Sequence, residues 1–184
     1  MNIYTIALLS CICIVIAFVI FIAIYLVTMK RHDENAKENY SFIIESFGKD
    51  NRGIVDMTFN REKAYYVSYF LYQLSGKAVN AGSVIFTVIT LYASNIEINS
   101  YDFWAIFIFR SLSLMSTIFV IMAVYLNPIA RAKDYLNAWR GTYEIVTRLL
   151  VDSPNLKEAD RIKFLSKVKE DLVEIEKGLT TDET

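Results

Sequence analysis

Polar side chains recur at regular steps within two apolar stretches of the sequence, and they are the residues best placed to do chemistry. In the first stretch an amide and four hydroxyls follow one another at intervals of three, four, three and four residues. Such intervals place all of them on one face of a helix. In the second stretch an arginine, a serine and a threonine share a face in the same way. The two sets are Asn80, Ser83, Thr87, Thr90 and Ser94, and Arg110, Ser113 and Thr117.

These two polar faces could line a path for ions or water. Polar groups inside a membrane are costly, and they turn toward protein or water. If several copies placed both faces toward a common axis, the lining would be rich in hydroxyls and would carry a ring of Arg110 side chains. Close packing between helices, with hydroxyls bonding across the interface, accounts for the same spacing equally well.

Little else in the sequence predicts chemistry. The chain has one His and two Cys, and it lacks a phosphate-binding glycine loop, a metal-ligand spacing and a nucleophile–base motif. Cys11 and Cys13 lie in an apolar run, where cysteine acts as a small hydrophobic residue. His32 follows Lys30 and Arg31 directly, which predicts an interfacial basic cluster. We therefore expect no enzyme, no catalytic residue, no bound metal and no cofactor.

The composition indicates a membrane protein. Of 184 residues, 54% are hydrophobic and 21% are charged, and residues 3–29 include no Asp, Glu, Lys or Arg. That run exceeds the roughly 20 residues needed to cross a bilayer. The net charge of -1 argues against a nucleic-acid partner, because such proteins carry a clustered basic excess.

Three segments are expected to cross the membrane, which predicts an all-α membrane protein. Residues 1–29 form an N-terminal transmembrane anchor. Residues 78–96 and 103–126 form a transmembrane hairpin, joined by a short loop over residues 95–102.

The basic residues predict the orientation of these segments. Eight Lys or Arg lie between Lys30 and Lys77, ten lie from Arg131 onward, and the loop between the second and third spans has none. Because basic residues are retained on the cytoplasmic side, we expect a multi-pass protein of the inner (plasma) membrane. Its N-terminus lies outside, and its C-terminus lies in the cytoplasm.

The segment 30–60 is expected to be a cytoplasmic linker that includes a helix. Residues 34–47 have a helical pattern, and residues 48–53 suit a loop because they are rich in turn formers. A further helix is predicted to begin at Arg61 with Asn60 as its cap. That helix is expected to run unbroken into the second span.

Aromatic residues crowd the start of this helix. Tyrosines gather where a helix meets lipid headgroups, so an interfacial aromatic belt is the favoured interpretation, and a ligand-binding cage is the alternative. The residues are Tyr65, Tyr66, Tyr69, Phe70 and Tyr72.

The C-terminal part is predicted to form two more helices. Asn127-Pro128 marks a break, residues 129–151 repeat apolar positions at helical steps, and residues 152–155 mark a second break. The helix over 156–179 has a nearly a/d apolar seam that must pack on its own chain or on a neighbour. Residues 180–184 are expected to be disordered. The candidates for oligomerisation on this seam are Leu165, Val168, Leu172 and Ile175.

The arrangement over residues 61–151 resembles the SLATT domains, a family of bacterial two-helix membrane effectors. The similarity rests on a tyrosine-rich entry helix, Arg61-Glu62-Lys63-Ala64-Tyr65-Tyr66, and on the transmembrane hairpin. It also rests on a helix that follows Pro128 and bears Arg131, Tyr135, Ala138, Trp139 and Arg140.

The resemblance implies a pore-forming effector of antiphage defence. An upstream sensor, often a synthase of a nucleotide second messenger, would trigger membrane leakage that halts the infected cell. The chain departs from the family pattern by an additional first span and by the C-terminal region 152–184, and it shows no fused nucleotide-binding domain. The implied partners are the lipid bilayer, further copies of the chain, and a separate sensor or nucleotide-signalling protein.

Two other functions remain open from the sequence. The chain could be a membrane-anchored adaptor that recruits a soluble partner through residues 156–179, or a holin-like phage protein. The adaptor hypothesis predicts that the hydroxyl face is dispensable, whereas the pore hypothesis requires it.

Overall fold

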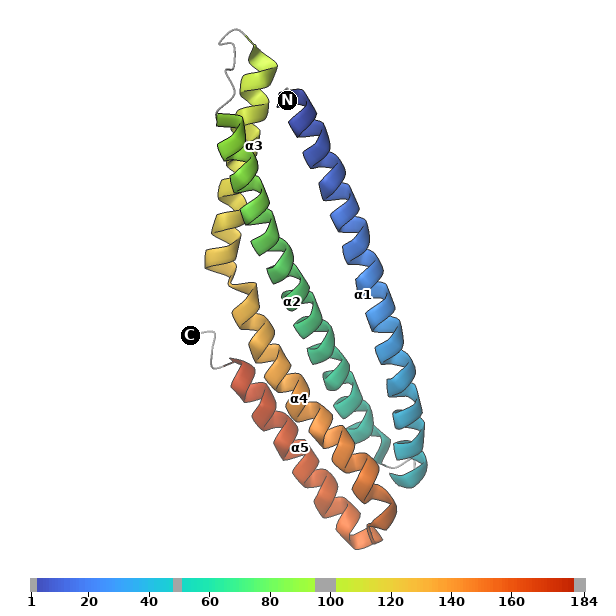
Figure 1. The fold of residues 1–184 in the computed structure, drawn as a ribbon. Helices are drawn as coiled ribbons and strands as arrows, with labels where there is room; N and C mark the ends of the chain where they lie inside the picture. Colours follow the sequence, from blue (N-terminus) through green and yellow to red (C-terminus); the bar gives the residue numbers. More distant parts are fainter. Residues whose placement is uncertain (1–2, 48–50, 95–101, 181–184) are drawn as a thin grey trace. The chain divides into compact units, whose positions relative to one another are not determined.

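The computed structural model describes residues 3–47, 51–94 and 102–180, and their regular structure is entirely helical. The described residues form five α-helices, which are labelled in Figure 1. Three stretches are long and apolar enough to cross a membrane: Val15–Phe47, Arg52–Tyr92 and Phe103–Asp152. The predicted all-α membrane fold with three spanning helices is confirmed. The helices are α1 (Ile3–Phe47), α2 (Arg52–Ser94), α3 (Phe103–Ile121), α4 (Pro128–Asp152) and α5 (Glu158–Thr180).

The first two helices are longer than predicted. Helix α1 has 45 residues and joins the first span to the predicted helix 34–47 without a break. Helix α2 has 43 residues and begins at Arg52, so the prediction that Asn60 caps a helix starting at Arg61 is wrong. No proline separates these segments, and Gly53 is tolerated in the first turn of α2. At about 1.5 Å per residue, each helix exceeds the ~30 Å hydrocarbon core.

Helix α3 has clear signals at both ends. Its start is capped by Asp102, whose side chain accepts a hydrogen bond from the backbone N–H of Ala105 at 3.0 Å. After Ile121 the chain forms a π-helical turn over Met122–Leu126, and Asn127 then adopts a left-handed conformation with φ 36°. Pro128 begins α4, where its fixed φ and missing N–H suit a first helical position. The predicted break at Asn127-Pro128 is confirmed.

The second predicted break also falls where expected. Ser153–Asn155 form a 3-10 turn between α4 and α5. The predicted loop between the second and third spans and the predicted disordered tail fall largely on residues 95–101 and 181–184, outside the described residues.

The chain divides into two compact units, each built from segments that are distant in sequence. The apolar unit comprises residues 1–25 and 72–129, and the four-helix unit comprises residues 26–71 and 130–184. Every Lys and Arg of the chain except Lys77 and Arg110 belongs to the four-helix unit. The linear segments 1–29, 30–60, 61–151 and 152–184 expected from the sequence do not coincide with these units.

The four-helix unit is held by a continuous apolar core with ion pairs around it. Arg61 Nη2 lies 2.8 Å from Glu176 Oε2, which links α2 to α5, and Arg148 Nη2 lies 2.7 Å from Asp171 Oδ2, which links α4 to α5. The core combines residues of α1, α2, α4 and α5: Ile43, Phe47, Val55, Ile145, Val146, Leu149, Leu165, Val168 and Leu172.

The apolar unit packs α2 against α3 through aromatic rings and small residues. The rings of Phe86 and Phe119 stack with centroids 5.2 Å apart. A Cβ added at Gly82 would lie 2.7 Å from the Phe119 ring, and one added at Gly76 would lie 2.8 Å from Ile129 Cγ1. These glycines are therefore required by close approach.

Candidate functional site

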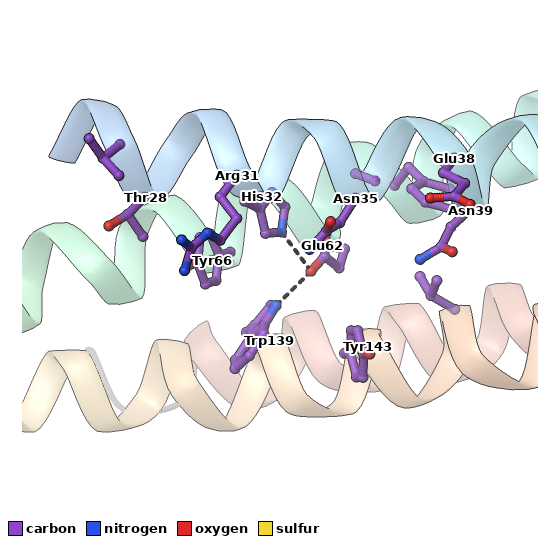
Figure 2. Close-up of a pocket in the computed structure, with 14 residues that line it drawn as sticks. Thr28, Arg31, His32, Asn35, Glu38, Asn39, Glu62, Tyr66, Trp139 and Tyr143 are labelled. Atoms are coloured by element: carbon purple, nitrogen blue, oxygen red, sulfur yellow. Dashed lines mark hydrogen bonds and ion pairs between the residues drawn. The ribbon is translucent and has the colours of Figure 1, made fainter. Parts of the chain in front are cut away.

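The strongest candidate site is a pocket of about 690 Å³ within the four-helix unit. Its size falls in the range of small-molecule sites. Figure 2 shows that α1, α2 and α4 contribute its walls, with Glu62 between His32 and Trp139. Apolar, amide, aromatic and charged groups all face this space, so the pocket can combine shape with a few directed polar contacts.

Glu62 is the polar centre of the pocket. Glu62 is 5% exposed, and its Oε1 lies 2.6 Å from Trp139 Nε1 and 3.1 Å from His32 Nε2. An ionised carboxylate only accepts hydrogen bonds, so both ring nitrogens donate to the same oxygen. One carboxylate thereby links α1, α2 and α4.

Aromatic rings surround this carboxylate. His32 stacks on Tyr66 with centroids 4.1 Å apart and planes at 13°. Tyr66 lies 5.2 Å from Trp139, which lies 6.2 Å from Tyr69 and 5.8 Å from Tyr143 between ring centroids. These rings form one connected cluster across three helices, which fixes the orientation of the indole and the imidazole.

Burial makes two tyrosines of α2 harder to ionise. Burial raises the pKa of Tyr66 above its ordinary value, and the nearby Glu62 and Tyr69 raise it further. Burial likewise raises the pKa of Tyr65, with Arg61 acting in the opposite direction. Both phenols therefore stay protonated to higher pH than an exposed tyrosine.

His32 has one nitrogen engaged and one without a hydrogen bond. Its Nδ1 is buried and has no hydrogen-bond partner among the described residues. Asp33 Oδ1 lies 4.0 Å from this nitrogen, which is too long for a hydrogen bond. That same oxygen lies 2.8 Å from Lys63 Nζ, so Asp33 already has a cationic partner.

The predicted polar face of α2 is only partly brought together with that of α3. Thr87 Oγ1 and Ser116 Oγ lie 3.1 Å apart on the exposed seam between these helices. Ser83 is half-buried, whereas Asn80 is exposed. Thr90 Oγ1 is buried and has no hydrogen-bond partner among the described residues.

Several predicted hydroxyls bond to their own helix. Ser94 donates to the carbonyl of Leu91, while Ser113 and Thr117 donate to the carbonyls four residues earlier. Such bonds satisfy a hydroxyl in a membrane helix without any second surface. Arg110 is exposed on α3. Of the predicted residues, Thr87 alone has a hydrogen bond between the two helices among the described residues. The exposed members of the two polar faces are Asn80, Thr87, Ser94, Arg110 and Thr117.

The four candidates for oligomerisation lie inside the chain's own core. Their exposed fractions are 2% for Leu165, 1% for Val168 and 0% for Leu172, and Ile175 packs against the same core. The apolar seam of α5 therefore packs on its own chain, and the expectation that these residues form an intermolecular interface is corrected. They are buried because α5 folds back along α4 after the turn at Ser153–Asn155.

The sequence did not reveal the pocket. His32 was predicted only as part of an interfacial basic cluster, yet its side chain is 12% exposed and contacts Glu62. Glu62 lies in a charged run that indicates a solvated face, and Trp139 is 77 positions away from it. The useful signal was the tyrosine-rich stretch in the first half of α2, because Tyr66 and Tyr69 take part in the aromatic cluster.

A second hollow of about 590 Å³ lies in the apolar unit between α1 and α2. Its lining is almost entirely apolar and includes small residues such as Ala78, Ala81 and Gly82.

The described residues contain no group of three or more His, Cys, Asp or Glu that could hold a metal ion. Comparison of the chain with protein-family models, curated proteins and solved structures gives no match.

Proposed function

We propose that this chain is an oligomeric membrane pore, or a membrane-disrupting effector, of bacterial antiphage defence. An upstream sensor would trigger it, and loss of membrane integrity would follow. The observation that carries the proposal is the exposed Thr87–Ser116 hydroxyl pair near the middle of the second and third spans.

An exposed hydroxyl in the middle of a membrane-spanning helix is stabilised when it contacts another polar group or water. Thr87 is exposed although it bonds to Ser116, and the surrounding surface of α2 is apolar, with Val84 63% and Val88 59% exposed. Association of several copies along this seam would remove the hydroxyls from lipid and would give them partners or water.

Arg110 adds a charge to the same helix pair. It lies seven residues after the start of α3 at Phe103, or about 10 Å along the helix axis. A guanidinium in hydrocarbon costs several kcal/mol unless it reaches the headgroups or a water-filled space. In an assembly, a ring of Arg110 side chains would disfavour the passage of cations.

The first span is well suited to rearrange during such assembly. Among the described residues of α1 from Val15 to Met29 none is buried, so few side-chain contacts oppose a displacement of this stretch. We place the four-helix unit in the cytoplasm, with the N-terminus outside, because it holds nearly all of the basic residues and these are retained on the cytoplasmic side.

The adaptor hypothesis depended on the apolar seam of α5. Leu165, Val168 and Leu172 occupy the intrachain core, so that seam is not available to a partner in this conformation. An adaptor would have to use other surface, and we retain the pore as the proposed function.

Cysteine accessibility at one membrane depth tests this proposal. In a background lacking Cys11 and Cys13, Thr87→Cys is compared with the neighbouring Val88→Cys in cells that carry the native operon and are challenged with phage. A membrane-impermeant thiol reagent should label the variant at Thr87 after challenge and leave the variant at Val88 unlabelled, because thiolate formation needs water. Equal labelling of both variants, or of neither, would overturn the proposal.

A further inference from the structure

The pocket of the four-helix unit holds a buried carboxylate, Glu62, for which the described residues provide no Lys or Arg partner. Other carboxylates of this unit have one: Asp33 pairs with Lys63, Glu176 with Arg61, and Asp171 with Arg148. Glu62 is less exposed than any of these three, yet its partners are an indole N–H and an imidazole.

The imidazole does not have to supply the missing charge. His32 satisfies Glu62 with the single N–H at Nε2, which a neutral imidazole can provide. The other imidazole nitrogen, Nδ1, has no hydrogen-bond partner among the described residues. A buried carboxylate with no guanidinium or ammonium group among its described partners is a favourable place for a ligand cation.

The walls of the pocket suit the same kind of ligand. Tyr66, Trp139 and Tyr143 all line it, and aromatic faces attract ammonium groups placed within about 6 Å of the ring centre. Arg31 and Glu38 also line the pocket and are exposed, so their formal charges offset each other. An anionic ligand would be repelled by Glu62 with only Arg31 to attract it.

We propose that this pocket binds a small organic cation, with its ammonium group against Glu62 and its methylene groups against the rings of Trp139 and Tyr143. The inference concerns binding by the four-helix unit and holds whether or not the chain forms a pore.

Trp139 offers a direct reporter. The chain has two tryptophans, so Trp104→Phe leaves Trp139 as the sole one, inside the proposed site. The full chain is purified in detergent and titrated with putrescine dihydrochloride, with sodium chloride at the same ionic strength as reference. We expect a saturable change in tryptophan emission with putrescine and none with sodium chloride.

Two variants in the Trp104→Phe background test the roles of charge and ring. Glu62→Gln keeps the size and an acceptor but removes the charge, and it should weaken binding by about tenfold, equivalent to about 1.4 kcal/mol. Tyr143→Ala removes an exposed wall of the pocket, so it leaves the core intact, and it should weaken binding by about two- to fivefold.

Glu174→Gln is the matched control, because it removes an exposed carboxylate of α5 away from the pocket and should leave binding unchanged. Helical circular dichroism confirms that each variant is folded. If Glu62→Gln does not fold, Tyr143→Ala against Glu174→Gln decides. The proposal is overturned if putrescine produces no saturable change, or if neither pocket variant binds more weakly than the Glu174 control.

Discussion

The indole nitrogen of Trp139 donates a 2.6 Å hydrogen bond to Oε1 of Glu62, which joins α4 to α2 across 77 positions of sequence. The same oxygen receives the imidazole of His32 from α1 at 3.1 Å. The Glu62 carboxylate therefore links α1, α2 and α4, which are three of the four helices in the four-helix unit. This contact orders both the pocket and the packing of these helices.

Replacing the indole should loosen this unit. Trp139→Phe keeps an aromatic ring and removes the donor, and a buried hydrogen bond to a charged group contributes about 1.5–3 kcal/mol. We expect a lower midpoint of denaturant unfolding, followed by circular dichroism in detergent. Trp104→Phe is the control, because Trp104 is 64% exposed. Equal midpoints for the two variants would show that the Glu62 contact adds little stability.

Because one face of α5 is buried in the core, alanine substitutions on this helix should lower the free energy of unfolding strongly at Leu172 and only slightly at Ile162. Leu172 is fully buried, whereas Ile162 on the same helix is 72% exposed. Leu172→Ala should cost about 2–5 kcal/mol of unfolding free energy, and Ile162→Ala should stay within about 0.5 kcal/mol.

The same pair of variants separates an intrachain core from an oligomer interface. We expect Leu172→Ala to lower stability without changing the size of the particle in detergent, as measured by light scattering. A variant that dissociates while remaining as stable as the wild type would instead place Leu172 between subunits.

Gly76 of α2 lies close to Ile129 at the start of α4. A side chain larger than hydrogen at position 76 would therefore force the Ile129 side chain or one of these helices to move. A Cβ there would lie 2.8 Å from Ile129 Cγ1 and 3.4 Å from the Ile129 nitrogen, whereas one at Gly53 would meet nothing within 4 Å. Gly76→Ala should lower the melting temperature. Gly53→Ala should leave it unchanged or raise it, because alanine favours a helix by up to about 1 kcal/mol. A stabilising Gly76→Ala would show that the helices are not in contact here.

The raised pKa of Tyr66, caused mainly by burial, predicts an alkaline loss of stability. The folded state holds the phenol proton more tightly than the unfolded chain, so this contribution is fully present below pH 10.0, the ordinary value. It is lost as the pH rises through the higher pKa of the folded protein. Unfolding midpoints measured across this window should fall less steeply for Tyr66→Phe. Identical slopes for the variant and the wild type would contradict the assignment.

The sequence predicted the elements better than their boundaries. Long apolar runs identified three spans because the bilayer imposes a minimum length, and Pro128 marked the start of α4 because proline suits a first helical position. The end of α1 and the start of α2 were harder to place. Nothing in the run from Lys30 to Asp33 breaks a helix, and Gly53 alone does not prevent one.

The candidate site could not be predicted, because its members come from three helices. Glu62 in a charged run and His32 after two basic residues both have the local pattern of solvated positions. Only the packing of α1, α2 and α4 places them around one oxygen. The polar face of α2 shows a second limit of prediction from sequence. Its helical spacing was correct, but spacing does not distinguish Thr87, which bonds to α3, from Ser94, which bonds to its own backbone.

The central claim is that the assembled chain breaches the membrane when it is triggered. The most direct measurement is the membrane potential of cells that carry the native operon, followed with a fluorescent dye during phage challenge. We predict depolarisation before lysis that requires this chain and is reduced in Thr87→Leu, which removes the exposed hydroxyl, with Val84→Leu unaffected. Cells that keep their potential until lysis, with or without the chain, would contradict the account.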